Sequence, residues 1–347
     1  MATKRLGGIA TSASVPDNGG DHSGGGSGGY VDDVFSTYLY EGNGGTQTIE
    51  NGIDLANEGG LVWVKNRTSG ALANRHVLTD TEMQKEVNGL YPFLSSNMPD
   101  ELNPAGSIVS FNEDGFASFG NQDWSNKPGE DYVSWTFRKA PNFFDVVTYT
   151  GDGVAGREIP HGLGCEVGFA IVKRTDAGTH WYAQHKDVDL TGNKTLYLSL
   201  PGPLQVSNNA WNSTHATSEN LIVGDHSDSN GLDGEYVAYL FAHDDSDKSV
   251  IKCGSFTTDA SGNATVSLGW EPQFILRKSS GSADNWNIAD TMRGLDATAT
   301  VSLYPNTSDG EYSGPTLHVP TGDGFEVTAT TPSTEYIYIA IRKPDTP

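Results

Sequence analysis

The chain has 347 residues, of which 36% are hydrophobic and 19% charged, and its formal net charge is −23 at pH 7. A surface this acidic repels a phosphate backbone, so we expect no nucleic-acid partner, because basic patches supply that affinity. No apolar run approaches the roughly 18 residues of a membrane span, so we expect no membrane insertion. Residues 1–6 lack the apolar stretch of a signal peptide, so we expect the protein to be made in a cytoplasm without processing.

Residues 1–35 are predicted to form an arm. Residues 18–29 have the Gly/Ser-rich composition of a linker and cannot bury a core. Residues 3–10 are small and slightly basic. Two interpretations stay open: a disordered tail, or an anchor by which the body docks on another protein.

One strand then occurs three times, at residues 130–141, 234–244 and 334–344. Each copy has an acidic residue, a tyrosine, an alternating apolar run and a polar stop, and the tyrosines lie about 100 residues apart. A domain-sized period predicts a repeated module. Both faces of this closing strand are rather apolar, so we expect it to be a central strand covered on both sides.

We therefore divide the folded part into three modules, at residues 36–141, 142–247 and 248–347. Each has roughly seven or eight short strands in about 100 residues, the size of an antiparallel sandwich. The 42 glycines and 16 prolines also favour short strands joined by tight turns. The predicted fold class is all-β, with three tandem antiparallel β-sandwich (jelly-roll-like) modules after a Gly/Ser-rich N-terminal arm.

Local signals within the modules predict turns and free thiols. Residues 42–45 contain an Asn-Gly dipeptide and are expected to close a hairpin, because Asn-Gly supplies positive φ. Residues 111–119 are expected to form a second hairpin. Cys165 and Cys253 occupy non-equivalent places in the repeats, so we expect two free thiols.

Several segments together resemble a domain family of uncertain function that recurs in virion proteins of marine tailed bacteriophages. They are Ser-Thr-Tyr-Leu-Tyr at 36–40, Asn-Gly-Ile-Asp-Leu at 51–55, residues 59–65, the closing strand with its Arg-Lys-Ala-Pro end at 138–141, and residues 143–151. Residues 161–164 followed by 171–174 are similar to a strand-turn-strand motif of phage fibre and tail proteins. The resemblance covers nearly all of residues 30–244 and implies a virion location without catalytic residues. The sequence departs from the motif at residues 165–167, where a proline normally precedes the apolar strand; the third module keeps that proline as Pro272.

The sequence gives no positive signal for an enzyme. Carboxylates are plentiful but lie scattered in turns, where Asp and Asn serve backbone geometry. No Gly-x-Ser-x-Gly elbow, His-Glu-x-x-His pair or phosphate-cradling loop occurs.

Residues 225–234 carry a candidate calcium site. Asp225, Asp228, Asn230 and Asp233 place oxygen ligands before a glycine, and calcium takes six to eight oxygens. The glutamate that ends a full EF-hand loop is missing. We favour the alternative, a solvated turn rich in Asp and Asn, and expect no other cofactor.

Two tryptophans are candidates for a glycan platform. Trp181 and Trp286 occupy equivalent points of two modules and have polar neighbours, as aromatic residues that stack on sugars often do. The alternative, which we favour, is packing in the core, where large aromatic residues dominate burial.

The leading functional hypothesis is a non-enzymatic structural virion protein of a tailed bacteriophage, a tail fibre or appendage subunit involved in host attachment. Its arm would bind other virion proteins, and by analogy with fibres we expect a homo-oligomer, with a trimer favoured. One alternative is a lectin-like module that binds a host surface glycan. Others are a capsid decoration or head fibre protein and, last, a depolymerase.

Overall fold

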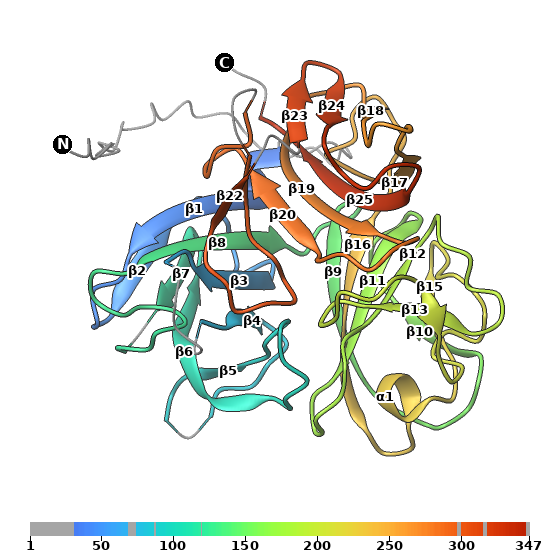
Figure 1. The fold of residues 1–347 in the computed structure, drawn as a ribbon. Coiled ribbons are helices and arrows are strands. Elements are labelled where there is room, and N and C mark those ends of the chain that lie inside the picture. The colour runs from blue at the N-terminus through green and yellow to red at the C-terminus, as the bar shows by residue number, and fades with distance from the viewer. Residues whose placement is uncertain are drawn as a thin grey trace, which may run out of the picture.

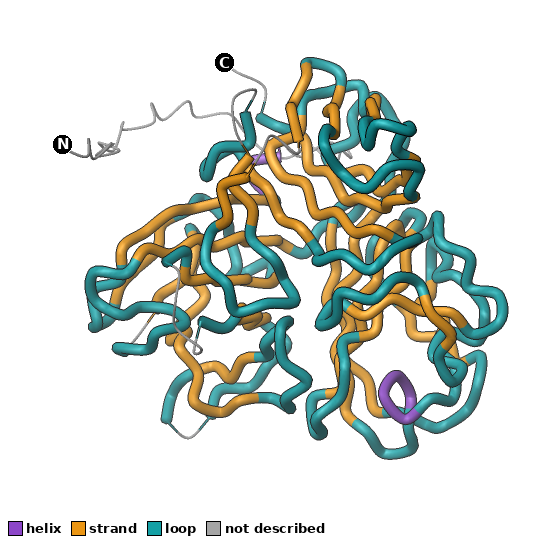
Figure 2. Tube along the Cα trace, viewed as in Figure 1, coloured by secondary structure: helices purple, strands orange, loops and turns teal. Residues whose placement is uncertain are grey.

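The computed structural model of the chain describes residues 31–68, 74–86, 88–118, 120–296, 300–314 and 318–344. Within these residues the only helices are a 3-10 turn, η1 (Val31–Asp33), and one short α-helix, α1 (Ser227–Asn230); all other elements are strands in antiparallel pairs (Figures 1 and 2). The all-β antiparallel class is therefore confirmed. Residues 1–30 of the predicted arm lie outside the described residues, and Val31 and Val34 are already buried in the core.

Three larger sheets share one order of strands: a first strand, the closing strand, the apolar strand and a following strand. Sheet I consists of β1 (Phe35–Glu41), β8 (Asp131–Arg138), β3 (Gly60–Asn66) and β4 (His76–Asp80). Sheet II consists of β9 (Phe144–Thr150), β16 (Glu235–Ala242), β11 (Val167–Arg174), β12 (Tyr182–His185), β13 (Lys194–Tyr197) and β14 (Gln205–Val206). Sheet III consists of β17 (Ile251–Thr257), β25 (Glu335–Arg342), β19 (Pro272–Ser279) and β20 (Asn287–Asp290). The closing strands β8, β16 and β25 each have a partner on both edges, so the predicted central position is confirmed.

Smaller sheets accompany the three larger ones. One consists of β2 (Gln47–Glu50), β7 (Gly115–Ser118), β6 (Asn103–Asn112) and β5 (Tyr91–Phe93); another of β10 (Arg157–Pro160) and β15 (Asn220–Val223); a third of β18 (Ala264–Ser267), β24 (Gly324–Val327) and β23 (His318–Thr321); the last of β21 (Thr300–Ser302) and β22 (Tyr312–Gly314). Side chains of sheet I and of the β2-β7-β6-β5 sheet share one buried cluster, which includes Val62, Val64, Phe93 and Phe116. These two sheets therefore form a sandwich.

The hairpin predicted at residues 42–45 is wrong. Strand β1 pairs with β8, and β2 pairs with β7, so this segment carries the chain from one sheet to the other. Gly44 does have positive φ, at 74°. The segment also passes close to the loop that precedes β8, so a Cβ on Gly42 would overlap the Lys127 carbonyl oxygen. Glycine is thus needed here for close approach rather than for a hairpin. The second predicted hairpin is confirmed by the pairing of β6 with β7, although Phe119 lies outside the described residues.

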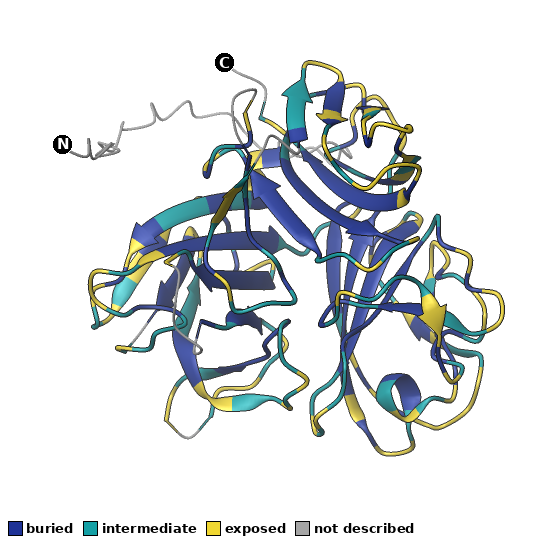
Figure 3. Ribbon diagram, in the orientation of Figure 1, coloured by how far each residue is buried: buried dark blue, intermediate teal, exposed yellow. Residues whose placement is uncertain are grey.

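The three larger sheets surround a common centre, where Figure 3 shows buried strands in dark blue. Alternate residues of the closing strands β8 and β25 divide between two cores. In β8, Val133, Trp135 and Phe137 enter a cluster shared by all three sheets, whereas Tyr132 belongs to the sandwich beneath sheet I. Because successive strand residues point to opposite faces, both faces of the closing strand are buried, as the sequence predicted.

Polar side chains link the three sheets into a closed ring. The fourth strand of each large sheet ends in a buried polar residue at a matching register position: Asp80 in sheet I, His185 in sheet II and Asp290 in sheet III. Each bonds to a different neighbouring sheet. The bonds are Tyr239 Oη to Asp80 Oδ2 (2.7 Å), His185 Nε2 with the Tyr338 carbonyl oxygen (3.1 Å), and Trp135 Nε1 to Asp290 Oδ2 (2.9 Å). Sheet I is thereby joined to II, II to III, and III to I.

Three buried lysines form a second set of such links. Lys65, Lys173 and Lys278 occupy matching positions in the apolar strands, and each is at most 1% exposed. Each ammonium group donates to a backbone carbonyl beside a neighbouring sheet. The acceptors are Ser308 for Lys65 (3.2 Å), Pro99 for Lys173 (3.2 Å) and Pro201 for Lys278 (3.1 Å). Burial lowers the pKa of each lysine to about 8.

The residues of sheets I, II and III therefore pack as one body with an internal three-part arrangement. A division into three sandwich modules at residues 36–141, 142–247 and 248–347 stays a prediction. The shared cluster and the two sets of links argue that no sheet is stable alone, because removing one would expose large aromatic side chains.

Candidate functional site

The two tryptophans considered as candidates for a glycan platform lie inside the protein. Trp181 is 0% exposed and Trp286 is 1% exposed. Trp181 Nε1 donates to the Ser95 carbonyl oxygen (2.8 Å), and Trp286 Nε1 donates to that of Tyr197 (2.9 Å). A platform for sugar stacking needs an exposed ring face, and neither residue has one. The burial of both rings contradicts the glycan candidate, and core packing, the interpretation favoured from the sequence, describes them.

The four residues considered as a candidate calcium site do not converge. Asn230 is buried, and its side chain bonds to Asp152, Val154 and Gly224. The other three have different surroundings: the Asp225 carboxylate accepts a bond from Asn209, and that of Asp228 accepts bonds from Ser227 and Tyr182. Asp233 is exposed, with φ at 58°. Among the described residues no group of three or more His, Cys, Asp or Glu could hold a metal ion. The segment is a turn that fixes its own backbone, which is the alternative interpretation.

The two cysteines are free, as predicted, with Cys253 buried and Cys165 partly buried. Burial raises the pKa of Cys165 to about 11 and that of Cys253 well above its ordinary value. A thiol of raised pKa is a poor nucleophile at neutral pH, because the thiolate is the reactive form. Neither cysteine is therefore a candidate for chemistry.

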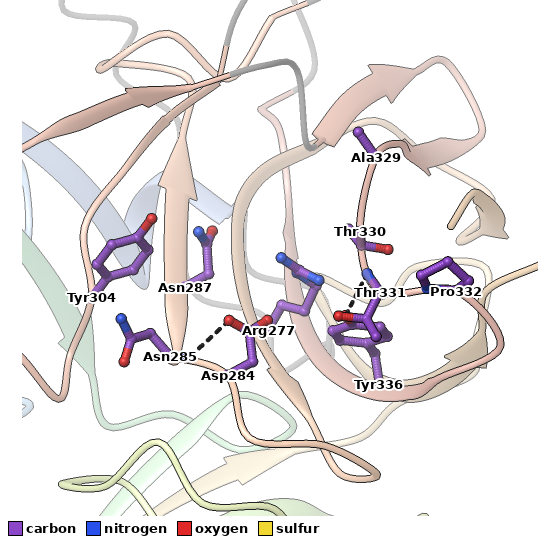
Figure 4. Close-up of a pocket in the computed structure, with 10 residues that line it drawn as sticks. All are labelled: Arg277, Asp284, Asn285, Asn287, Tyr304, Ala329, Thr330, Thr331, Pro332 and Tyr336. Atoms are coloured by element: carbon purple, nitrogen blue, oxygen red, sulfur yellow. Dashed lines mark hydrogen bonds between the residues drawn. The ribbon is translucent and has the colours of Figure 1, made fainter. Parts of the chain in front are cut away.

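The structure instead contains a polar pocket beside sheet III. Its volume is about 440 Å³, within the usual range for small-molecule sites. Strands β19, β20 and β25 supply Arg277, Asn287 and Tyr336, and the segment that precedes β25 supplies Thr330 and Thr331 (Figure 4). The remaining lining residues are Asp284, Asn285, Tyr304, Ala329 and Pro332. Hydroxyl, amide and guanidinium groups thus outnumber apolar side chains.

Arg277 is the central side chain of this pocket. It is 4% exposed, and its Cζ lies 4.6 Å from the centre of the Tyr336 ring. Tyr336 in turn stacks on Phe256 with ring centres 5.3 Å apart. Guanidinium groups bind well to the face of an aromatic ring, so this stack holds the guanidinium group in a fixed orientation between Asn287 and Tyr336 (Figure 4).

Two nitrogens of this guanidinium group, Nε and Nη1, are buried and have no hydrogen-bond partner within the structure. The same is true of Asn287 Oδ1 across the strand pair. Burial lowers the pKa of Arg277, and the Tyr336 and Asp284 side chains oppose that shift. A buried cation without full hydrogen bonding is costly in free energy. Acceptor oxygens supplied by a ligand would therefore stabilise the Arg277 guanidinium group.

The register of the three sheets shows how this pocket arises. The pair Arg277–Asn287 in sheet III corresponds to Val64–Val77 in sheet I and to Val172–Tyr182 in sheet II. Buried valine and tyrosine side chains therefore occupy the matching positions in the other two sheets. Sequence reasoning missed the pocket, although one signal was present: an arginine precedes Lys278 where valine precedes Lys65 and Lys173.

The protein is all-β, its three larger sheets share a core, and a polar cavity of ligand size lies beside sheet III. A family model described as a domain of unknown function (DUF7483) matches residues 31–344, and the chain belongs to this family. No curated protein matches the chain. Within the described residues no helix is long and apolar enough to cross a membrane.

Proposed function

We propose that the chain is a non-enzymatic structural protein of a tailed-bacteriophage virion, a tail fibre or related appendage subunit. The observation that carries the proposal is the closed ring of buried contacts among sheets I, II and III. Such a ring makes a rigid block, which suits a particle component that must keep its shape while it bears load. The likeness of residues 36–40, 59–65 and 132–151 to phage virion domains also supports it.

In this proposal the Gly/Ser-rich residues 18–29 tether the block to another virion protein. The net charge of −23 keeps neighbouring copies soluble before assembly. Homotrimerisation, expected by analogy with fibres, belongs to the same proposal. The mass in solution, measured by light scattering against the 37.0 kDa of one chain, tests it separately.

The test of the virion role is to locate the chain on particles. Antibodies raised against residues 31–344 should label one structure of purified virions in immunogold electron microscopy, and a reconstruction should contain density for the three-sheet block. Failure to find the chain on any particle overturns the proposal.

Copy number separates a fibre from a capsid decoration protein. A fibre or appendage predicts a few copies confined to the tail, whereas a decoration protein predicts many copies at lattice positions on the head. Quantitative mass spectrometry of purified particles, normalised to the major capsid protein, measures this directly.

A further inference from the structure

We propose that the pocket around Arg277 binds a carboxylate-bearing sugar, of the uronate class. The inference concerns ligand binding by sheet III and does not depend on where the chain lies on a particle. It rests on the two unpartnered nitrogens of the guanidinium group, the polar lining and the size of the cavity.

The carboxylate follows from Arg277. Its buried Nε and Nη1 have no partner within the structure, and no carboxylate of a described residue forms a salt bridge with it. A carboxylate accepts two parallel N–H···O bonds from one edge of a guanidinium group, either Nε with Nη2 or Nη1 with Nη2. Each edge of Arg277 contains one of the unpartnered nitrogens, so a ligand carboxylate on either edge would supply a missing acceptor. The chain has 44 Asp and Glu side chains, yet none of those in the described residues forms a salt bridge with this buried arginine.

The sugar follows from the rest of the lining. The Asn285 and Asn287 amides and the Thr331 hydroxyl offer both donors and acceptors. The Thr330 hydroxyl, which donates to the Gly262 carbonyl oxygen, and the Asp284 carboxylate offer further acceptors. Neighbouring hydroxyl groups of a sugar ring need such a mixed set. Asn287 Oδ1, which lacks a partner, is an acceptor for a ligand hydroxyl. The cavity, at about 440 Å³, holds one or two sugar rings.

The matching positions in the other sheets support a specialised site. Val64 and Val77 fill the equivalent space in sheet I, and Val172 and Tyr182 fill it in sheet II. Only the pair in sheet III is Arg277 with Asn287. We therefore expect one binding site per chain rather than three.

The experiment is isothermal titration calorimetry of the full chain with D-glucuronate, D-glucose and inorganic phosphate at physiological salt. The expected result is one site that binds glucuronate at least ~10-fold more tightly than either glucose or phosphate, because a bidentate charged pair and the hydroxyl contacts both contribute. Arg277→Met should weaken glucuronate binding at least ~10-fold, and Arg277→Lys should also weaken it, since lysine lacks the planar fork.

A matched control is Arg174→Met. Arg174 also lies over a closing-strand tyrosine, with its Cζ 5.9 Å from the centre of the Tyr236 ring, but it pairs with Asp176 and lies in sheet II. Its replacement should leave glucuronate binding unchanged. Arg277→Met should remain folded, because it removes a buried unpaired charge, and its unfolding midpoint verifies this independently of binding.

Three outcomes overturn the inference. The first is that glucuronate shows no saturable binding to the wild-type chain. The second is that glucose or phosphate binds as tightly as glucuronate, which would remove the carboxylate or the sugar from the assignment. The third is that folded Arg277→Met binds glucuronate as the wild type does.

Discussion

The three buried lysines that link the sheets should make the protein more stable in mild alkali. Their folded pKa values are about 8, against an ordinary value of 10.5. The unfolded chain therefore binds more protons than the folded chain between these values, so the free energy of unfolding rises as pH rises through this window. From pH 7 to pH 9 the gain is about 1–2 kcal/mol for each lysine and roughly 4 kcal/mol for the three.

The perturbation is the triple variant Lys65→Met, Lys173→Met and Lys278→Met, which keeps most of the side-chain volume. Urea unfolding of both proteins at pH 7, 8 and 9 gives the free energy of unfolding at each pH. The difference between wild type and variant isolates the lysines, because the tyrosines and thiols are common to both. Absolute stability at pH 7 is not the test, since the three carbonyl acceptors lose their donors in the variant.

The wild type should gain roughly 4 kcal/mol relative to the triple variant between pH 7 and pH 9, and a single Lys65→Met variant should show about a third of that change. A difference that stays constant across this range would refute the reasoning. It would mean that the ammonium groups are not held away from water as the structure has them.

Two further predictions concern the ring of polar contacts. Asp290→Ala should lower the free energy of unfolding by about 3–5 kcal/mol, because it leaves the buried Arg293 guanidinium group without the carboxylate that lies 2.7 Å away; a loss below ~1 kcal/mol in urea unfolding would contradict this. Burial raises the pKa of Asp80 to about 6, so its contribution to stability is fully present below pH ~4 and is lost as pH rises through 6. Asp80→Asn should therefore flatten the pH dependence of stability between pH 4 and 7, and an unchanged profile would show that Asp80 does not titrate in this range.

The repeat and the alternating pattern of the closing strand predicted much of the fold. Apolar residues on both faces of the strand indicated a central position, and β8, β16 and β25 all have it. The pattern could not show that one face packs in a sandwich and the other in a centre shared by all three sheets. That distinction depends on contacts between residues about 100 or more positions apart, such as the bond between Trp135 and Asp290.

The candidate site was harder to predict, because a residue type in a pattern does not give its exposure. Trp181 and Trp286 occupy equivalent places because each fills a space between sheets, as core residues of a repeat do. The polar pocket depends on a local exception to the repeat. A single substitution of arginine for valine at the Arg277 position, with Asn287 opposite, is visible in the sequence only after the apolar strands are aligned.

Scanning calorimetry of residues 31–344 tests most directly whether the three sheets form one interlocked body. The shared core and the ring of contacts predict a single unfolding transition in which the calorimetric enthalpy equals the van't Hoff enthalpy. The same account predicts that a fragment of residues 142–247 alone shows no cooperative transition. Two or three separable transitions in the whole chain, or a cooperatively folded fragment, would contradict it.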